Sequence, residues 1–441
     1  MDRKCTCSDL VGQYIDDGRL LLIQTIGSGS NGVVYLALDL ATENPPPRQY
    51  AVKCVPKAPR GSRALYMQRQ EVEFQATVCD HPNILTLHTV IEDEHNLFIV
   101  SDHCPGGDFF TFLSNNRPFR RNDAYLKRIF LQLLDAVEAC HDENIFHRDI
   151  KPENILISAD AKQVYLCDFG LATTKPFSRS FGCGSSHYMS PECIGFDMSL
   201  QGYSTRQNDV WALGVILLSM ICGHNPWRHA TIEDPCYRAF VKDSDYLGKT
   251  LPISAAANNI FRRIFMPEPL RRVSLPLLRL MVLQIDTFFM TDDEISRSSD
   301  HVKNAAARFF AEPVPRPPTS PPLERWIHVP GWDFSDNTLC SEGSADSSAS
   351  PPTPPPHYDE PVQCEAADPT PAILEVPRGQ NNNEDEHPPE SMHHSGVQFG
   401  HEPRERIRIR RSFPSKASLK ERHMGLVGRI FDRFSPHRVE H

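Results

Sequence analysis

The sequence predicts an α+β protein with a small β-rich lobe, a larger helical lobe and a tail that does not pack. Strand-like alternation of apolar residues begins at Leu20, and helical spacing of apolar residues begins at Asp123. With 441 residues, 38 of them proline, and 40% hydrophobic residues, the chain is too long for one compact domain and too polar to pack throughout. The expected units are an N-terminal extension over 1–19, a globular domain over 20–289 and a largely disordered tail over 290–441.

Composition and charge exclude several classes of protein. The net charge of −10 argues against a protein that coats nucleic acid. The thirteen cysteines are scattered through apolar segments, which favours a reducing compartment over a disulfide framework. The first residues lack the apolar core of a signal sequence, and the longest uncharged apolar run, Val210–Cys222, is shorter than the ~20 residues that cross a bilayer. We therefore expect a cytoplasmic or nuclear protein without a transmembrane segment.

A glycine-rich hairpin is predicted near the start of the domain. The strand pattern of Leu20–Ile26 runs into Gly27, Gly29 and Gly32, and a second strand pattern follows over Tyr35–Asp39. Glycines let backbone N–H groups approach phosphate closely, although a plain glycine hairpin has the same spacing. A dinucleotide-binding turn would need a helix after the glycines, so the second strand argues against that fold.

Lys53 ends the next short strand and is a candidate phosphate ligand. A lysine on a strand commonly only covers apolar surface with its stem. Placed after a glycine hairpin, it is a candidate for the lysine that holds the α- and β-phosphates of ATP. Such a lysine needs a carboxylate from the following helix, predicted around Ala64–Val78. Glu71 is the favoured partner and Glu73 the alternative.

The most informative stretch is the octet HRDIKPEN, which spans His147–Asn154 between two apolar runs. Asp149 could accept a proton from a hydroxyl, and Lys151 could neutralise a moving phosphoryl group. Asn154 could offer an oxygen to a divalent cation. Beyond a predicted short hairpin, Asp168 in the triplet Asp-Phe-Gly would be the second oxygen ligand for Mg²⁺. Taken alone, the octet could be an ordinary polar loop.

The order of these motifs resembles that of a eukaryotic protein kinase domain over Leu20–Phe289. The glycine loop, Ala-Val-Lys, HRDIKPEN, Asp-Phe-Gly, Ser-Pro-Glu at 190–192 and the segment Asp209–Gly214 all occur in the family's order. The resemblance implies the bilobal protein kinase fold, with ATP and Mg²⁺ as cofactors. Lys151 in the octet is typical of the serine/threonine kinases, which implies protein substrates that carry serine or threonine.

The resemblance also implies the roles of individual residues. The catalytic set would be Asp149, Lys151, Lys53 and Glu71, and the metal ligands would be Asn154 and Asp168. The nucleotide would contact Gly27, Gly29, Gly32, Val34, Ala51, Lys53, Asp102, Cys104, Asp108 and Leu156. Asp108 could instead be an acid favoured at a helix N-terminus, and both readings can hold. Asp209 would brace the catalytic loop, Glu192 would pair with Arg272, and the hydroxyl of Ser185 would bridge Asp149 and Lys151.

One segment, Phe181–Cys193, resembles the fungal kinases of the Ran/Pat type, which restrain conjugation and meiosis. This implies a role in fungal nutrient, mating or meiosis signalling. The alternative is an ATP-binding scaffold or regulatory protein that acts through its fold and tail. Intact Lys53, Asp149, Asn154 and Asp168 favour the enzyme.

The tail changes sign along its length. An acidic, proline-rich stretch is followed by Glu402–His441, which holds eleven Lys and Arg against five acids. This basic end could contact regulatory proteins, a nuclear-import receptor, an acidic membrane, nucleic acid or the acidic stretch before it. Within it, Met424–Phe434 has the spacing of a short amphipathic helix.

Overall fold

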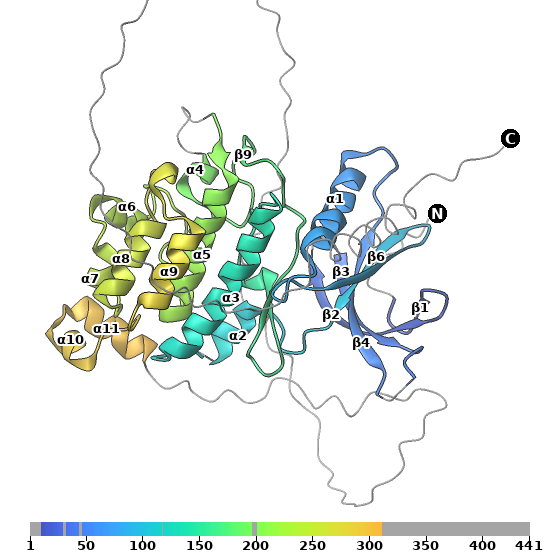
Figure 1. Cartoon of the computed structure of the whole chain (residues 1–441), viewed down its shortest axis with the longest axis horizontal. Coiled ribbons are helices and arrows are strands. Elements are labelled where there is room, and N and C mark those ends of the chain that lie inside the picture. The colour runs from blue at the N-terminus through green and yellow to red at the C-terminus, as the bar shows by residue number, and fades with distance from the viewer. Residues whose placement is uncertain (1–9, 30–31, 44–45, 117, 196–200, 311–441) are drawn as a thin grey trace, which may run out of the picture.

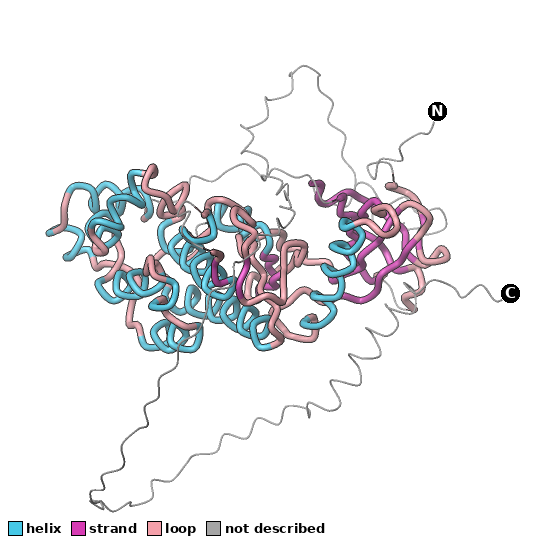
Figure 2. The backbone as a smooth tube through the Cα atoms, turned by 90° about the horizontal axis from the view of Figure 1, so that it is seen from above, coloured by secondary structure: helices cyan, strands magenta, loops and turns pink. Residues whose placement is uncertain are grey.

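The computed structural model describes residues 10–29, 32–43, 46–116, 118–195 and 201–310. Two lobes lie side by side, a sheet with one helix and a bundle of helices (Figure 1). Viewed from above, the large sheet lies at one end of the molecule, and most of the helices, with a few short strands among them, lie towards the other (Figure 2). The bilobal α+β kinase fold expected from the sequence is therefore confirmed.

The smaller lobe is an antiparallel six-stranded sheet with the order β1-β2-β3-β4-β6-β5. Alternate residues of its strands bury one apolar cluster, in which Tyr35 and Val52 are central. Helix α1 covers the other face, and Ser62 caps it by accepting a hydrogen bond from the Leu65 amide at 3.1 Å. The elements are β1 (Tyr14–Ile15), β2 (Leu20–Gly29), β3 (Gly32–Asp39), β4 (Arg48–Pro56), α1 (Arg63–Val78), β5 (Leu87–Glu92) and β6 (Asn96–Asp102).

The hairpin between β2 and β3 requires glycine at one position in particular. Gly32 has φ of +126°, and a Cβ built there would lie 2.3 Å from the carbonyl oxygen of Cys54. Only glycine accepts both this backbone conformation and this close approach. Gly29, its partner across the hairpin, has open space around the position of a Cβ.

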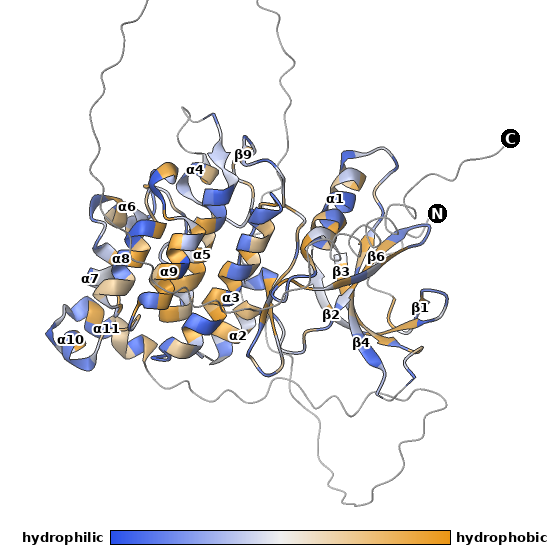
Figure 3. Ribbon diagram, in the orientation of Figure 1, coloured by the Kyte–Doolittle hydropathy of each residue, from blue (hydrophilic) through white to orange (hydrophobic). Residues whose placement is uncertain are grey.

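The larger lobe is built around α5, whose residues are almost all buried and which Figure 3 draws largely in hydrophobic colours. Helices α3 and α8 contact it, and Trp211 packs against the tilted ring of Trp227 and the edge-on ring of Phe265. The elements are α2 (Phe109–Asn116), α3 (Asp123–Asp142), β7 (Ile155–Ile157), β8 (Val164–Leu166), β9 (Phe177–Ser178), α4 (Pro191–Ile194), β10 (Tyr203–Ser204), α5 (Thr205–Cys222), α6 (Pro235–Lys242), α7 (Tyr246–Thr250), α8 (Ala255–Ile264) and α9 (Leu275–Gln284). None of the helices in the described ranges combines the length and apolar content that a membrane span needs.

The packed structure extends beyond the expected 20–289 at both ends. Leu10 lies in the core of the small lobe, and β1 pairs with β2. At the other end, α10 (Asp292–Arg297) and α11 (Asp300–Phe309) follow, and α11 buries Val302 against the lobe. Short, polar amphipathic segments such as these give weak composition signals. The predictions made for 311–441 lie outside the described residues.

Candidate functional site

A buried carboxylate positions the catalytic loop. Asp209 of α5 accepts hydrogen bonds from the backbone N–H groups of His147 at 3.0 Å and Arg148 at 2.8 Å. Its Oδ2 atom also lies 2.9 Å from Nε2 of His141 in α3. These bonds hold Arg148 at φ 63°, a left-handed conformation that side chains rarely adopt. The buried helix α5 therefore fixes the backbone of the catalytic loop through Asp209.

The loop brings Asp149, Lys151 and Asn154 together. Nζ of Lys151 lies 2.9 Å from Oδ2 of Asp149 and donates to Oγ of Ser185 at 2.8 Å. The amide nitrogen of Asn154 donates to Oδ2 of Asp149 at 3.1 Å, and the Ser185 N–H donates to Oδ1 at 2.9 Å. The bridge expected from Ser185 is present. Asp149 is thus a carboxylate oriented by three donors, one of which carries a positive charge.

The donor set at the end of the loop suits a hard divalent cation. Asn154 uses its amide nitrogen on Asp149, which leaves its amide oxygen as a ligand. Burial opposes ionisation of Asp168, but the charges of Lys53 and His147 hold the pKa of Asp168 below its ordinary value. An amide oxygen and an ionised carboxylate are ligands that Mg²⁺ accepts, with its remaining positions filled by water and phosphate. The described residues contain no cluster of three or more His, Cys, Asp or Glu that could form a separate metal cage.

Lys53 joins the two lobes. Its Nζ lies 2.6 Å from Oε1 of Glu71 and 3.4 Å from Oδ1 of Asp168. The structure therefore pairs Lys53 with Glu71, whereas the alternative Glu73 is exposed to solvent on α1. Desolvation works against the charged lysine, yet the carboxylates of Glu71 and Asp168 raise the pKa of Lys53 above its ordinary value. The ammonium group therefore stays charged, between a carboxylate of the small lobe and one of the large lobe.

The Asp-Phe-Gly triplet links this ion pair to the catalytic loop. Phe169 is buried, with its ring 5.1 Å from that of His147. A Cβ at Gly170 would lie 3.3 Å from both the Asp168 and Glu71 carboxylates, so glycine leaves room for them to meet Lys53. The helix of the small lobe, the triplet and the loop are thus assembled as one connected arrangement.

Predicted nucleotide-binding residues lie on the neighbouring strands β2, β3 and β4. Gly27 and Val34 pair across the β2–β3 hairpin, and Val34 pairs with Lys53 on the other side. Ala51 pairs with Ser101 at the rear of the sheet.

The connection between the lobes contributes Asp102, Cys104 and Asp108. The Asp102 carboxylate lies 2.7 Å from Nε2 of His88, and the Asp102 backbone N–H donates to the carbonyl of Thr86 at 3.2 Å. The N–H of Gly107 donates to the carbonyl of Cys104 at 3.1 Å and tightens this turn. Asp108 accepts from the Thr111 amide and hydroxyl, both at 2.8 Å, so it stabilises the start of α2, and it bridges to Leu156. The helix-end reading of Asp108 is therefore correct, and its contact with ribose stays a prediction.

The Ser-Pro-Glu segment is tied to the core by a buried ion pair. Glu192 receives two hydrogen bonds from Arg272, at 2.6 and 3.1 Å. Arg272 also donates to the carbonyls of Met266 and Gln207. The predicted pairing of Glu192 with Arg272 is confirmed. The sequence reading missed His141, which supports Asp209 from α3, because a lone histidine on an apolar helix face has no motif around it.

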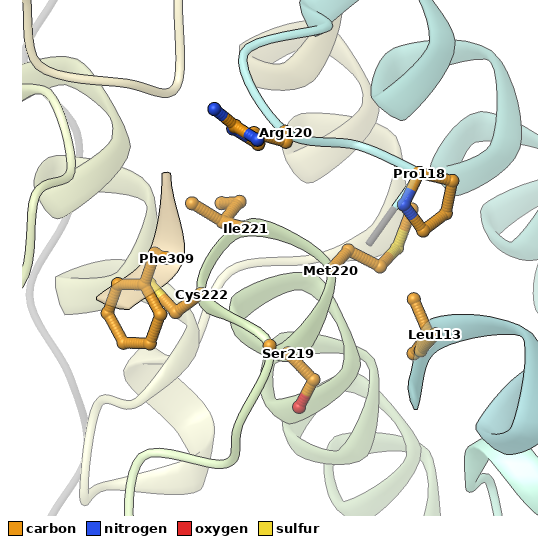
Figure 4. Close-up of a pocket in the computed structure, with 9 residues that line it drawn as sticks. Leu113, Pro118, Arg120, Ser219, Met220, Ile221, Cys222 and Phe309 are labelled. Carbon is orange, nitrogen blue, oxygen red and sulfur yellow. The ribbon is translucent and has the colours of Figure 1, made fainter. Parts of the chain in front are cut away.

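A small pocket lies away from this site, at the C-terminal end of α5 (Figure 4). Met220 and Cys222 of α5 line it, together with Leu113 of α2 and Phe309 of α11. Asp209 lies near the other end of the same helix, about 20 Å away at 1.5 Å per residue. The pocket is therefore not part of the catalytic cleft.

Comparison with known proteins agrees with this geometry. The chain is 40% identical over 292 residues to the negative regulator of sexual conjugation and meiosis of Schizosaccharomyces pombe, covering 62% of this chain and 61% of that protein. It is 32% identical over 353 residues to the serine/threonine-protein kinase VHS1 of Saccharomyces cerevisiae, covering 66% and 75%. The serine/threonine-protein kinase ksp1 of Schizosaccharomyces pombe is 35% identical over 277 residues, covering 61% and 57%.

The chain thus spans about three fifths of the length of the first of these relatives. The protein kinase domain model matches residues 21–280, which is more than half of the chain and contains every side chain of the catalytic arrangement described above. The chain belongs to the protein kinase family.

Proposed function

We propose that this protein transfers the γ-phosphoryl group of ATP to serine or threonine hydroxyls of protein substrates. The observation that carries the proposal is the single connected arrangement of Lys53, Glu71 and Asp168 with Asp149 and Lys151. A kinase fold that acted only as a scaffold would not need all of these charged side chains to be held in contact with one another. The two relatives named as serine/threonine-protein kinases support the choice of hydroxyl.

Each residue has a distinct role in this proposal. Asp149 orients the substrate hydroxyl and accepts its proton as the oxygen attacks phosphorus. Lys151, held by Ser185, offsets negative charge on the transferred group. Lys53 positions the α- and β-phosphates. Asn154 and Asp168 would hold Mg²⁺, which neutralises phosphate charge when bound.

The cell process is a further part of the proposal. The name of the first relative concerns sexual conjugation and meiosis, and we infer a signalling role of the same kind for this chain. Expression of this protein in fission yeast that lack that relative tests the inference. Restored control of conjugation supports it, and a stable, active protein that restores nothing contradicts it.

The activity itself is tested by phosphate transfer from labelled ATP with Mg²⁺ onto a degenerate serine/threonine peptide library. Asp149→Asn removes the proton acceptor while keeping the size of the side chain, so we expect transfer to be lost and nucleotide binding to remain. Asp142→Asn, at the exposed end of α3, is the matched control and should transfer normally. An Asp149→Asn protein with wild-type activity would show that the role of Asp149 is misassigned.

A further inference from the structure

Helix α9 carries an apolar stripe on its outer face. Its inner face packs into the large lobe through Leu275, Leu278 and Val282. Leu277, Leu280 and Leu283, three residues apart, are 41%, 52% and 52% exposed. Single exposed leucines are common on protein surfaces, but a contiguous row of them along a helix is typical of a surface that binds another segment. No segment in the described part of the chain covers this row.

One edge of the stripe is acidic. Arg279 lies on the side of α9 that faces α3, where its Nη2 atom is 2.5 Å from Oδ1 of Asp135 and 2.9 Å from Oε2 of Glu138. Both carboxylates are partly exposed. Two carboxylates share one guanidinium, so this cluster has a net negative charge, while Lys127 of α3 contacts the Ile285 carbonyl beyond the end of α9. A partner for the stripe therefore needs an apolar face with positive charge along one side.

We propose that Met424–Phe434 of the same chain docks on this stripe as a helix. The segment lies outside the described residues, and its sequence supplies the required pattern. At helical spacing, one face would hold Met424, Val427, Ile430, Phe431 and Phe434. At helical spacing, Arg433 would lie beside this face, next to Ile430, whereas Arg429 would lie further round on the polar side. The apolar pattern is complementary on the two surfaces, and Arg433 would supply positive charge beside the apolar face of the segment.

The connection is long enough for this contact. The described residues end at Phe310, in the same lobe as α9, and residues 311–423 lie between that point and the docking segment. A chain of this length can reach up to about 370 Å, which far exceeds the distance across one lobe. Because the segment is tethered, docking is intramolecular and competes well with binding in trans.

We expect the segment to become helical only on contact with α9. Gly425 and Gly428 lie within it, and glycine disfavours an isolated helix. Burial of its apolar face against Leu277, Leu280 and Leu283 is what would offset this cost. Helix formation in the segment should therefore depend on the surface of α9.

The experiment is hydrogen–deuterium exchange of the full chain, read on amides of residues 424–434. We expect exchange slowed about ten-fold relative to an unstructured segment, as for a helix docked about nine-tenths of the time. Leu280→Glu should return these amides to the unstructured rate, and Phe431→Glu should do the same from the other side. Leu270→Glu is the matched control, because Leu270 is 97% exposed in the turn before α9 and off the helix. It should leave the slow exchange unchanged.

Three outcomes would overturn the proposal. The first is unstructured exchange of residues 424–434 in the wild-type chain, and the second is slow exchange that Leu280→Glu does not relieve. The third is slow exchange that appears only at high protein concentration or only with anionic vesicles, which would assign the segment to a second copy or to a membrane. A melting temperature of Leu280→Glu equal to that of wild type checks that the substitution acts on the surface alone.

Discussion

The domain contains two ion pairs of similar length, Arg272–Glu192 and Lys53–Glu71, that differ in their exposure to solvent. Arg272 and Glu192 meet at 2.6 Å with side chains 0% and 5% exposed, and two backbone carbonyls accept the remaining arginine donors. Lys53 and Glu71 also meet at 2.6 Å, but their side chains are 21% and 15% exposed and Asp168 lies beside them. In the first pair, which we call closed, every arginine donor is used inside the buried contact. In the second pair, which we call open, the lysine is shared with Asp168 and stays partly exposed. A closed pair stabilises the fold, and an open pair is available to a ligand.

The largest effect on activity is expected when the charge of Lys53 in the open pair is removed. Lys53→Met should lower the rate of phosphate transfer by at least about a hundred-fold, the effect typical of removing one group that stabilises transition-state charge. Stability should fall less than when Arg272 is removed, because the Glu71 and Asp168 side chains left behind are 15% and 32% exposed, whereas Glu192 is 5% exposed. Lys57→Met, which removes a lysine paired with Glu92 on the same lobe, is the control for activity. Steady-state kinetics and thermal unfolding measure both quantities, and a Lys53→Met protein that transfers phosphate normally would contradict the assignment.

Removing one partner of the closed pair should lower the stability of the domain. Arg272→Met leaves the buried Glu192 carboxylate without a partner, and we expect the free energy of unfolding to fall by about 3–5 kcal/mol. Arg271→Met is matched in chemistry, but Arg271 is exposed and pairs with Glu268 only at the surface, so it should cost about 0–1 kcal/mol.

Denaturant unfolding compares the two variants. Glu192→Gln combined with Arg272→Met should recover part of the loss, because the buried charge is removed. Equal losses for Arg272→Met and Arg271→Met would show that the buried pair is not the stabilising contact inferred here.

The smallest expected effect on turnover comes from removing the Ser185 hydroxyl that contacts Lys151. Ser185→Ala removes one acceptor from Lys151, whose contact with Asp149 at 2.9 Å remains. A lost hydrogen bond of this kind is worth about 1 kcal/mol, so turnover should fall several-fold. Ser185→Thr keeps the hydroxyl and should retain most of the activity. If alanine and threonine behave alike in the transfer assay, the hydroxyl does not position Lys151.

Much of the catalytic loop could be predicted from sequence because its contacts are local. Asp149, Lys151 and Asn154 lie within six residues, so a short loop brings them together with little help from the rest of the chain. The order of motifs along the chain also indicated the family, since each motif is a local sequence with its own chemistry.

The choice between Glu71 and Glu73 could not be made from sequence. Two residues apart on a helix, these side chains point to different faces, and only the packing of α1 on the sheet turns Glu71 towards Lys53. The support of Asp209 by His141 depends likewise on α3 and α5 lying side by side. Such contacts join residues far apart in the chain, and no local pattern encodes them.

The sequence by itself determined the family, the chemistry of the catalytic loop and the two-lobed division. The tertiary structure alone decided which glutamate completes the ion pair, that packed elements lie on both sides of residues 20–289, and that one face of α9 stays uncovered by the described residues. The physical reason is the range of the interactions. Loop chemistry and periodicity act over a few neighbouring residues, whereas burial and pairing across elements depend on how the whole chain packs.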